Sequence, residues 1–590
     1  MFYPFLDLLA CSACRGALTL LAASERPKRT ALRMHRAQRM GPVGAPVGPT
    51  LETSRSTVLG RLLSLAAAEP VHDGRDFEVE VVDGVLVCAG CGRWYPVRSS
   101  LPELLPDHLR SRDEERERLS GFLAAWSTPP LQAIRDFLLN GPRPVPRIAA
   151  DEGAHYKIAE MAITKRTLPE GFWGPPLVEP FHPQRPQFSL DLLARFTTTL
   201  QRLECGLNAM LLDICAGYAW TTEWLVRLGY RAIGVDICRD YMLAGLPRME
   251  SFVPHLLVAD VENLPLADDL FDGVFSFDAF HHVPGRPRAM REFERVMRPG
   301  ARIALIEPGK EHEHHPGSVA VMKQHGILEK GFDQADLTAY VSGTSLGNIV
   351  HHRSDAHPHD IFVVQKGASV LPDTRSPRSL LAKIVPEPAS GLTRAGEPAT
   401  LWISVTNCGD TVWLDSTPDG VGTVSLGARL FTDQRELLLD HYVRVRLPRE
   451  LRPNETLSVR IELPAIARAG HYLVEFDMVD DLGSIHRVIR KVVDDRINDF
   501  DLYDNGLLWF KDFAFQAVDW PLTVDGEQPS APADTALTNA SDRGPAWPLE
   551  WRVQPPPQAE AKRTARSKPL PAWKRWPRAL ARRLARWSGL

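Results

Sequence analysis

The sequence lacks the features that would assign it at once to a membrane, secreted or nucleic-acid-coating class. It contains no run of about 18 apolar residues, so no membrane-spanning helix is expected. Its first residues have no basic segment, and Asp7 interrupts their apolar run, so no signal peptide is expected and the cytoplasm is the default compartment. The formal net charge is -4 over 590 residues, with a pI near 6.6, which argues against a nucleic-acid partner for the bulk of the chain.

Cysteine is also scarce, with eight residues in the whole chain. Four of them form two CxxC pairs, Cys11 with Cys14 and Cys88 with Cys91. In a chain without a secretion signal, this spacing favours a metal site over disulfides. Four thiolates on two turns suit a tetrahedral structural zinc ion, and two reduced pairs without metal are the alternative.

The sequence is a succession of differently patterned segments, as expected of a chain too long for one core. Residues 26–50 are basic and then rich in Gly and Pro, which is typical of a flexible insertion. Helical and strand patterns alternate from about 188 to 367, which predicts an α/β domain with a parallel sheet. The predicted parts are 1–106 as a zinc-binding module with a long insertion, 107–187 as a linker or helical segment, 188–367 as the α/β domain, 380–495 as an all-β domain, and 526–590 as a disordered linker with a basic tail.

The all-β prediction depends on a hydrophobic period of two. Leu401, Ile403 and Val405 share one face of a predicted strand. Residues 457–463 and 472–478 alternate in the same way, and turn signals separate these short strands. The spacing predicts a β-sandwich.

The segment LLDICAGYAWTTEWLVRLGYRAIGVD, residues 211–236, has the pattern strand, turn, helix, strand. In such a unit the N–H groups of the turn and the helix N-terminus face the ligand, and an acidic residue after the second strand can bind ribose hydroxyls. Asp236 stands at the spacing from Gly217 that this role requires. The turn has one glycine where several are usual, so a βαβ unit without a ligand is the alternative on this motif alone.

Three later segments extend the pattern: ADVENLPLADDLFD at 259–272, FSFDAFHHV at 275–283 and RVMRPGARIALIEPG at 295–309. Here the sequence resembles the class I S-adenosylmethionine-dependent methyltransferases, most closely the group called type 11. The resemblance implies a Rossmann-like sheet of seven strands, which residues 348–353 and 360–365 would complete.

The resemblance also implies roles by position around the cofactor S-adenosyl-L-methionine. Cys215 and Ala219 depart from the family, which usually has glycine there; both are small, so a close approach of the cofactor is expected if their φ angles are negative. The implied cofactor-binding residues are Asp213, Cys215 and Gly217 for the methionine part, Asp236 and Ile237 for the ribose and adenine, and Asp260 and Val261 for the adenine edge.

The sulfonium methyl group is already activated, so a protein needs mainly to position it and exclude water. An oxygen acceptor must also lose a proton, and His281 and His282, which follow the fourth strand, are the candidate general bases. Asp278, at the end of that strand, faces cofactor and acceptor according to the resemblance. A histidine that only hydrogen-bonds the loop is the alternative. Glu307 either orients the acceptor or is a solvated loop residue.

The histidine-rich run EHEHHPG at 311–317 suggests a metal site formed by His312, His314 and His315. Surface positions or contacts with the acceptor are the alternative for these histidines. The segment GVLVCAGCGRWYPVRSSLPELLP at 84–106 resembles the Trm112-like zinc-ribbon family, although the gap between the two CxxC pairs is longer than that family's usual loop. In relatives such a ribbon lies beside a methyltransferase as a stabiliser or a substrate-facing cover.

The segment WISVTNCGDTVWL at 402–414 resembles immunoglobulin-like sandwich repeats, in which Trp413 would pack across the core. An architectural spacer and a carbohydrate-binding module are both compatible with it. The tail at 562–590 has no acidic residue, and its tryptophans and leucines form one apolar stripe, which is typical of a helix at an anionic membrane surface. RNA binding and a solvated tail are the alternatives for the tail.

These patterns together predict an S-adenosylmethionine-dependent methyltransferase with a zinc ribbon before it and a β-sandwich after it. The predicted acceptor is a sugar hydroxyl of a glycan or glycolipid at the inner membrane face. RNA methylation is the alternative reaction, because some ribosomal-RNA methyltransferases also pair a four-cysteine module with this fold. A binding or scaffold protein that has lost activity is the alternative class.

Overall fold

The fold is taken from a computed structural model of the chain. No helix among the residues it describes is both long and apolar enough to cross a membrane. Nearly all of the predicted insertion at 26–50 and of the predicted linker and tail at 526–590 lie outside those residues. The structure describes residues 1–27, 79–124, 129–140, 153–167, 177–182, 185–206, 209–249, 255–353, 359–417, 420–481, 491–493, 496–498, 507–512 and 516–526.

The α/β part contains a seven-stranded sheet, as predicted. All of its strands run in one direction except the strand at His359–Lys366, which pairs antiparallel with both of its neighbours. The residues of β5 (Met210–Ile214) and β6 (Arg231–Asp236) are buried along their whole length, as expected of strands covered on both faces. In sheet order the strands are β10 (Leu346–His352), β11 (His359–Lys366), β9 (Met297–Pro308), β8 (Phe271–Phe277), β5 (Met210–Ile214), β6 (Arg231–Asp236) and β7 (Leu256–Val258).

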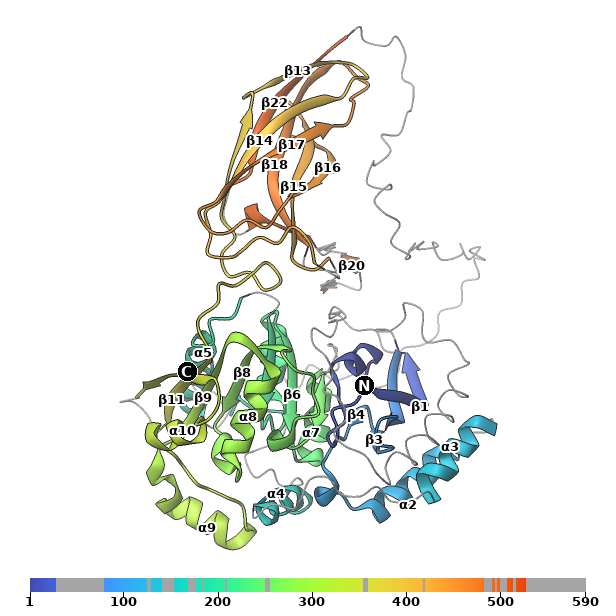
Figure 1. The fold of residues 1–590 in the computed structure, drawn as a ribbon, viewed down its shortest axis with the longest axis vertical. Coiled ribbons are helices and arrows are strands. Elements are labelled where there is room, and N and C mark those ends of the chain that lie inside the picture. The colour runs from blue at the N-terminus through green and yellow to red at the C-terminus, as the bar shows by residue number, and fades with distance from the viewer. Residues whose placement is uncertain are drawn as a thin grey trace, which may run out of the picture. The chain divides into compact units, whose positions relative to one another are not determined.

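Helices flank this sheet (Figure 1). In α8 (Arg286–Val296), Ala289, Met290, Phe293 and Val296 recur at the helical period, and all are buried on one face. The helices of this part are α4 (Ala154–Thr167), α5 (Pro186–Gln201), α6 (Trp220–Arg227), α7 (Arg239–Gly245), α8 (Arg286–Val296), α9 (Pro316–His325) and α10 (Gln334–Tyr340), with short 3-10 turns at Val261–Asn263, Phe280–His282 and Lys310–His314.

The N-terminal module is an antiparallel sheet of four strands, β1 (Leu18–Pro27), β2 (Val79–Cys88), β3 (Trp94–Arg98) and β4 (Leu101–Pro102). It continues the β7 edge of the seven-stranded sheet, because Leu104 N–H donates to Val258 O at 2.9 Å. Leu9 pairs with Leu266 in an isolated β-bridge, and the two parts share one buried apolar cluster. Helices α2 (Arg112–Leu123) and α3 (Pro129–Asn140) follow the module.

The C-terminal part consists of two main sheets, as the period of two predicts (Figure 1). Leu401, Ile403 and Val405 are buried, whereas Trp402 between them is exposed. Trp413 is fully buried, and its ring lies 5.1 Å from that of Phe510, as expected of a core residue. One sheet contains β12 (Ala382–Glu387), β14 (Ala399–Asn407) and β17 (Thr456–Leu463); the other contains β13 (Gly391–Arg394), β22 (Val518–Asp525), β18 (Gly470–Asp481), β15 (Thr423–Thr432) and β16 (Leu437–Arg446), with β21 (Leu507–Trp509) beside β18.

Candidate functional site

The turn between β5 and α6 has a left-handed backbone at three positions. Cys215, Gly217 and Ala219 have φ angles of 52°, 53° and 57°. The negative φ that the sequence analysis required at Cys215 and Ala219 is therefore not observed. Each of these two residues carries a strain of roughly 1–2 kcal/mol that glycine would avoid. The turn stays open nevertheless, because a Cβ added to Gly217 would meet no atom within 4 Å.

Asp213 and Asp236 fix this turn. Asp213 accepts hydrogen bonds from the hydroxyls of Thr221 and Thr222, at 2.7 and 2.5 Å, which tie the start of α6 to the end of β5. Asp236 accepts the N–H of Gly217 at 2.8 Å. Burial raises the pKa of Asp213 to about 7, although the two hydroxyls act to lower it. Each carboxylate oxygen has a second lone pair, so Asp236 can still accept a hydrogen bond from a ligand hydroxyl.

Asp260 is paired with a lysine that the sequence analysis did not identify. Lys157 Nζ of α4 lies 2.8 Å from Asp260 Oδ2 and 2.9 Å from Glu262 Oε2, and all three side chains are buried. Burial lowers the pKa of Lys157, but the two carboxylates outweigh burial and raise it above its usual value. Helix α4 therefore lines the cavity beside Asp260, together with Ile237 and Val261.

His281 is held between two carboxylates. Its Nδ1 lies 2.8 Å from Glu307 Oε2, and its Nε2 lies 3.5 Å from Glu329 Oε2. Burial lowers the pKa of His281, but the interactions with Glu307 and Glu329 outweigh burial and raise it to about 10. At neutral pH His281 is therefore a charged imidazolium and has no lone pair with which to accept a proton.

Glu307 organises the loop after β8. Its carboxylate accepts hydrogen bonds from Ser276 Oγ at 3.0 Å and from the N–H groups of Ala279 and Phe280 at 3.2 and 2.9 Å. The side chain is fully buried, so it is not a solvated loop residue. Glu307 therefore positions His281 and its loop from inside the core.

His282 has the opposite electrostatic setting from its neighbour. Burial and the charge of His281 lower the pKa of His282 to about 4, so its ring is neutral at neutral pH. Its buried Nδ1 makes no hydrogen bond with the described residues, and the carboxylate of Glu160 lies 4.0 Å away. Burial raises the pKa of Glu160 to about 8, which leaves that carboxyl largely protonated at neutral pH. Of the two predicted bases, His282 is the one that can accept a proton.

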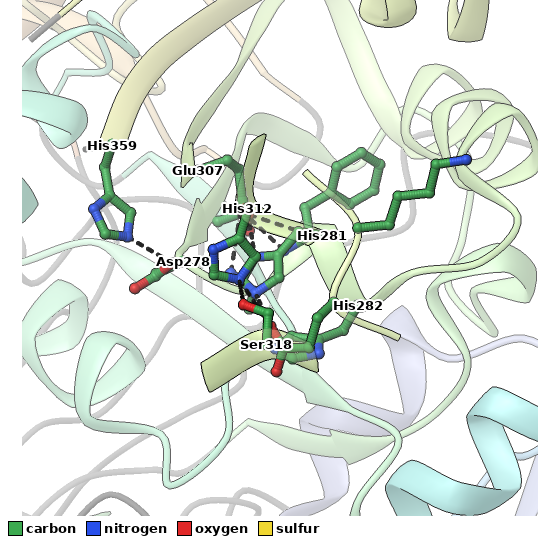
Figure 2. Close-up of polar contacts among 12 residues, drawn as sticks. Asp278, His281, His282, Glu307, His312, Ser318 and His359 are labelled. Carbon is green, nitrogen blue, oxygen red and sulfur yellow. Dashed lines mark hydrogen bonds and ion pairs between the residues drawn. The ribbon is translucent and has the colours of Figure 1, made fainter. Parts of the chain in front are cut away.

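Asp278 forms a separate pair with His359 of β11, whose Nε2 lies 2.9 Å away (Figure 2). Burial acts to raise the pKa of Asp278, but the bond from His359 outweighs it and lowers the pKa to about 2. Figure 2 also shows the ring of His312 beside that of His281, and His312 Nε2 lies 2.8 Å from Glu329.

The other two histidines of the 311–317 run do not join His312. His314 is exposed, and His315 Nδ1 instead accepts the N–H of Gly317 at the start of α9. The three histidines therefore do not form the metal site that their spacing suggested.

One cavity of about 1110 Å³ connects these groups. All of the residues predicted to bind cofactor or to act in catalysis line it, from Asp213 on β5 to His282 after β8. Protein sites for one small ligand usually span about 300–1,000 Å³, so this cavity has room for a cofactor and an acceptor together. Residues of the cavity wall that the sequence analysis missed are Lys157, Glu160, Arg195, Glu329 and His359.

The four cysteines of the two CxxC pairs meet in the N-terminal module. Cys11 Sγ lies 3.6 Å from Cys91 Sγ, and Cys14 Sγ lies 3.5 Å from Cys88 Sγ. All four sulfurs lie within 4.8 Å of one another and are buried. These separations are too long for disulfides, whose sulfurs lie about 2.05 Å apart. They are close to the roughly 3.8 Å expected around a tetrahedral ion with metal–sulfur bonds of about 2.3 Å.

Comparison of the sequence with known families gives a match for the α/β part and another for the N-terminal module. Residues 212–305 match the sequence model of a family described as a methyltransferase domain, and residues 3–100 match the Trm112p-like protein family. The chain contains a methyltransferase domain and a Trm112-like module. The predicted fold class is confirmed, whereas the predicted domain boundaries and the immunoglobulin-like character of the sandwich stay predictions.

Curated relatives match only part of this chain. Methyltransferase GfsG of Streptomyces halstedii is 33% identical over 129 residues, which is 20% of this chain and 46% of the relative. Demethylmenaquinone methyltransferase of Mycobacterium tuberculosis is 33% identical over 109 residues, which is 18% of this chain and 45% of the relative. The chain therefore spans less than half the length of the curated relatives it matches.

Among solved structures, the complex of the Haloferax volcanii Trm112 methyltransferase activator with a methyltransferase is 15% identical to this chain. The match covers 30% of this chain and 93% of the other, with a TM-score of 0.26. At this score the likeness adds nothing to the two family matches.

Proposed function

We propose that this chain uses S-adenosyl-L-methionine to methylate a hydroxyl group. The observation that carries the proposal is the single cavity lined by the Gly217 turn, Asp236 and Asp260 at one end and by Asp278 and His282 at the other. The open backbone of Gly217 and the spare lone pairs of Asp236 fit the methionine and ribose parts of the cofactor. When bound, the cofactor supplies an activated methyl group.

The residues of the chain then position the acceptor and remove its proton. His282 is the general base in this proposal, because its ring is neutral and faces the cavity. His281 and Glu307 hold the loop on which His282 stands, and Asp278, held by His359, contributes a negative charge. The cavity walls hold the acceptor hydroxyl and the transferred methyl group next to each other, which is the main contribution that this reaction needs from a protein.

Titration calorimetry with S-adenosylhomocysteine tests the cofactor assignment. Wild-type protein should bind it, and Asp236→Ala should weaken binding by about tenfold or more, since a charge-assisted hydrogen bond is worth about 1.5–3 kcal/mol. Asp240→Asn is the matched control, because Asp240 carries the same charge four residues along the chain and does not line the cavity. No binding by the wild type would favour a scaffold protein that has lost activity.

The acceptor remains a sugar hydroxyl in this proposal, supported by the β-sandwich that follows the enzyme domain. Two curated relatives are named for quinones, demethylmenaquinone and 2-phytyl-1,4-naphtoquinone, which makes a quinone ring the second acceptor class. The aromatic rings of Trp220 and Phe277 in the cavity wall suit either ring type. Incubation with a radiolabelled cofactor and fractionated lysate separates the two, because the label enters either carbohydrate or lipid-soluble quinone.

We also infer that the four cysteines bind one structural zinc ion and that the basic tail contacts anionic membrane. Metal analysis of purified protein tests the first inference: stoichiometric zinc supports it, and a folded protein free of zinc overturns it. Liposome flotation tests the second, by comparing the full chain with a chain that ends at residue 560. Equal flotation of the two overturns it.

A further inference from the structure

The cavity wall contains a buried guanidinium that the proposed reaction does not use. Arg195 stands on α5 and is 8% exposed. Its Nε and Nη1 atoms are buried and make no hydrogen bond with any described residue. The guanidinium carbon lies over the ring of Phe277, 5.5 Å from its centre, and Phe277 also belongs to the cavity wall.

No carboxylate in the described residues pairs with this cation. Burial lowers the pKa of Arg195, and the negative charges of Asp278 and Asp191 act to raise it. Asp278 is engaged by His359 at 2.9 Å, and Asp191 accepts a hydrogen bond from Gln187 at 3.1 Å on the exposed face of α5. Buried charges in proteins are normally paired, because an unpaired one costs several kcal/mol. An unpaired guanidinium in a cavity wall therefore indicates a ligand that brings the missing anion.

The position of Arg195 assigns this ligand to the acceptor end of the cavity. Phe277 ends β8, Asp278 follows it directly, and His359, the partner of Asp278, belongs to β11. In the sheet, β8 and β11 lie on one side of β5, whereas β6 and β7, which lead to Asp236 and Asp260, lie on the other. The adenosine part of the cofactor and the Arg195 subsite therefore occupy opposite sides of the central strand.

The subsite combines a cation with apolar rings. The rings of Trp220 and Phe277 meet edge to face at 5.1 Å, and Phe188 and Leu192 of α5 line the same cavity. A guanidinium presents parallel N–H groups that match the two oxygens of a carboxylate. The chemistry that fits is a ring that packs on Trp220 and Phe277 and carries a carboxylate for Arg195.

We propose that Arg195 binds the carboxylate of the methyl acceptor, so that the acceptor is a ring-bearing organic acid rather than a neutral alcohol. This inference rests on the proposed methyltransferase function and specifies its substrate class. A uronic acid and a hydroxylated aromatic acid share this chemistry. Arg195 acts as a binding residue that holds the acceptor hydroxyl near His282.

The first test needs no ligand. Replacing Arg195 with Met removes a buried unpaired charge while keeping much of the side-chain volume. If the charge serves binding, Arg195→Met should raise the Tm by about 2–4 °C. Arg202→Met, at the exposed C-cap of the same helix, should leave the Tm unchanged within about 1 °C. A fall in Tm for Arg195→Met would show that contacts within the protein hold the guanidinium, and would overturn the proposal.

The second test measures binding to protein loaded with S-adenosylhomocysteine. Titration calorimetry compares two matched pairs: glucuronate with glucose, and 4-hydroxybenzoate with 4-hydroxybenzamide. In the wild type and in Arg202→Gln, at least one acid should bind roughly tenfold or more tightly than its neutral partner. In Arg195→Gln that preference should disappear, and Arg195→Lys should restore part of it. The pair that responds identifies the source of the carboxylate.

Three outcomes contradict the proposal. The first is that neither acid is preferred by the wild type, and the second is that the preference survives in Arg195→Gln. The third concerns the cofactor's own carboxylate: if Arg195→Gln weakens S-adenosylhomocysteine tenfold but leaves 5′-methylthioadenosine, which lacks the carboxylate, unchanged, Arg195 serves the cofactor. Failure of the wild type to bind S-adenosylhomocysteine is a different result and overturns the proposed function itself.

Discussion

At the scale of single residues, the two adjacent histidines after β8 show how position alone divides two chemical roles. His281 lies between Glu307 and Glu329 and has a pKa raised to about 10, whereas burial and the charge of His281 lower the pKa of His282 to about 4. The sequence pattern HH treats the two as equivalent. The carboxylates that distinguish them come from β9 and from residue 329, far along the chain, and no local motif reveals that contact.

His282→Gln should lower kcat by about 10²–10⁴-fold, the usual contribution of a general base, and leave the affinity for S-adenosylhomocysteine unchanged. The wild-type rate should be flat from pH 6 to 8 and fall as the pH approaches 4, because His282 then becomes protonated. A methyl-transfer assay over this range checks both. His314→Gln, at an exposed position, is the control; a His282→Gln enzyme of normal kcat would exclude the base role.

His281 makes the stability of the folded protein fall as the pH rises, whereas His282 makes the rate fall as the pH decreases. Its pKa is raised from about 6.5 in the unfolded chain to about 10 in the folded protein, so the folded state favours the charged ring. The stabilisation is complete below pH 6.5 and is lost as the pH rises through 10. The unfolding free energy of the wild type should therefore decline from pH 7 to 10, and that of His281→Asn should decline less. Denaturant titrations at each pH measure the free energy of unfolding of the two proteins. An equal decline with pH in the wild type and in His281→Asn would contradict the prediction.

The turn after β5 offers a test of backbone strain. Ala219→Gly should relieve roughly 1–2 kcal/mol of left-handed strain and lose about 0.5–1 kcal/mol to chain entropy, so the protein should be equally stable or slightly more stable. The affinity for S-adenosylhomocysteine should stay within about threefold. Ala216→Gly in the same turn, where φ is not positive, should destabilise instead. Thermal melts compare the stability of the two variants, and calorimetry compares their affinity for S-adenosylhomocysteine. If Ala219→Gly were less stable than Ala216→Gly, the strain assigned to Ala219 would be wrong.

At the scale of elements, strands were more predictable than the helices that cover the site. The seven strands follow from buried apolar runs, and the sandwich strands follow from alternation, as at Leu401, Ile403 and Val405. The position of helix α4 within the predicted linker or helical segment at 107–187 was not foreseen, because its apolar residues do not form a stripe and its flanks are rich in proline. Lys157 and Arg195 point into the cavity from such covering helices, and their roles depend on distant partners rather than on local sequence.

Helix α4 is fixed to the methyltransferase domain by the buried cluster of Lys157, Asp260 and Glu262. Lys157→Met leaves two buried carboxylates without their lysine, so the free energy of unfolding should fall by about 3–5 kcal/mol. Lys157→Arg should lose less, because it keeps the charge. Lys323→Met, on the exposed side of α9, is the control in the same denaturant titration. A Lys157→Met protein as stable as this control would show that the cluster contributes no net stability.

At the scale of the whole molecule, the N-terminal module and the methyltransferase domain share one apolar core. Phe5, Leu9 and Leu104 from the module are buried in the same cluster as Leu257 and Leu266 from the domain. Arg15 adds polar contacts, since its guanidinium lies 2.8 Å from Glu292 and 3.0 Å from Asn263 Oδ1. Because this surface is apolar and continuous with the edge strand β7, we expect the domain to depend on the module to cover it.

This shared core predicts that loss of the proposed zinc ion weakens more than the zinc module. Cys88→Ser removes one of four thiolates, so the module should lose its metal and its order. The apolar surface around Leu257 and Leu266 would then be exposed, and binding of S-adenosylhomocysteine and the Tm should fall together. Cys408→Ser, at an exposed cysteine of the sandwich, should change neither. Retention of full cofactor binding by a zinc-free Cys88→Ser protein would show that the methyltransferase domain is stable without the module, which the continuous core argues against.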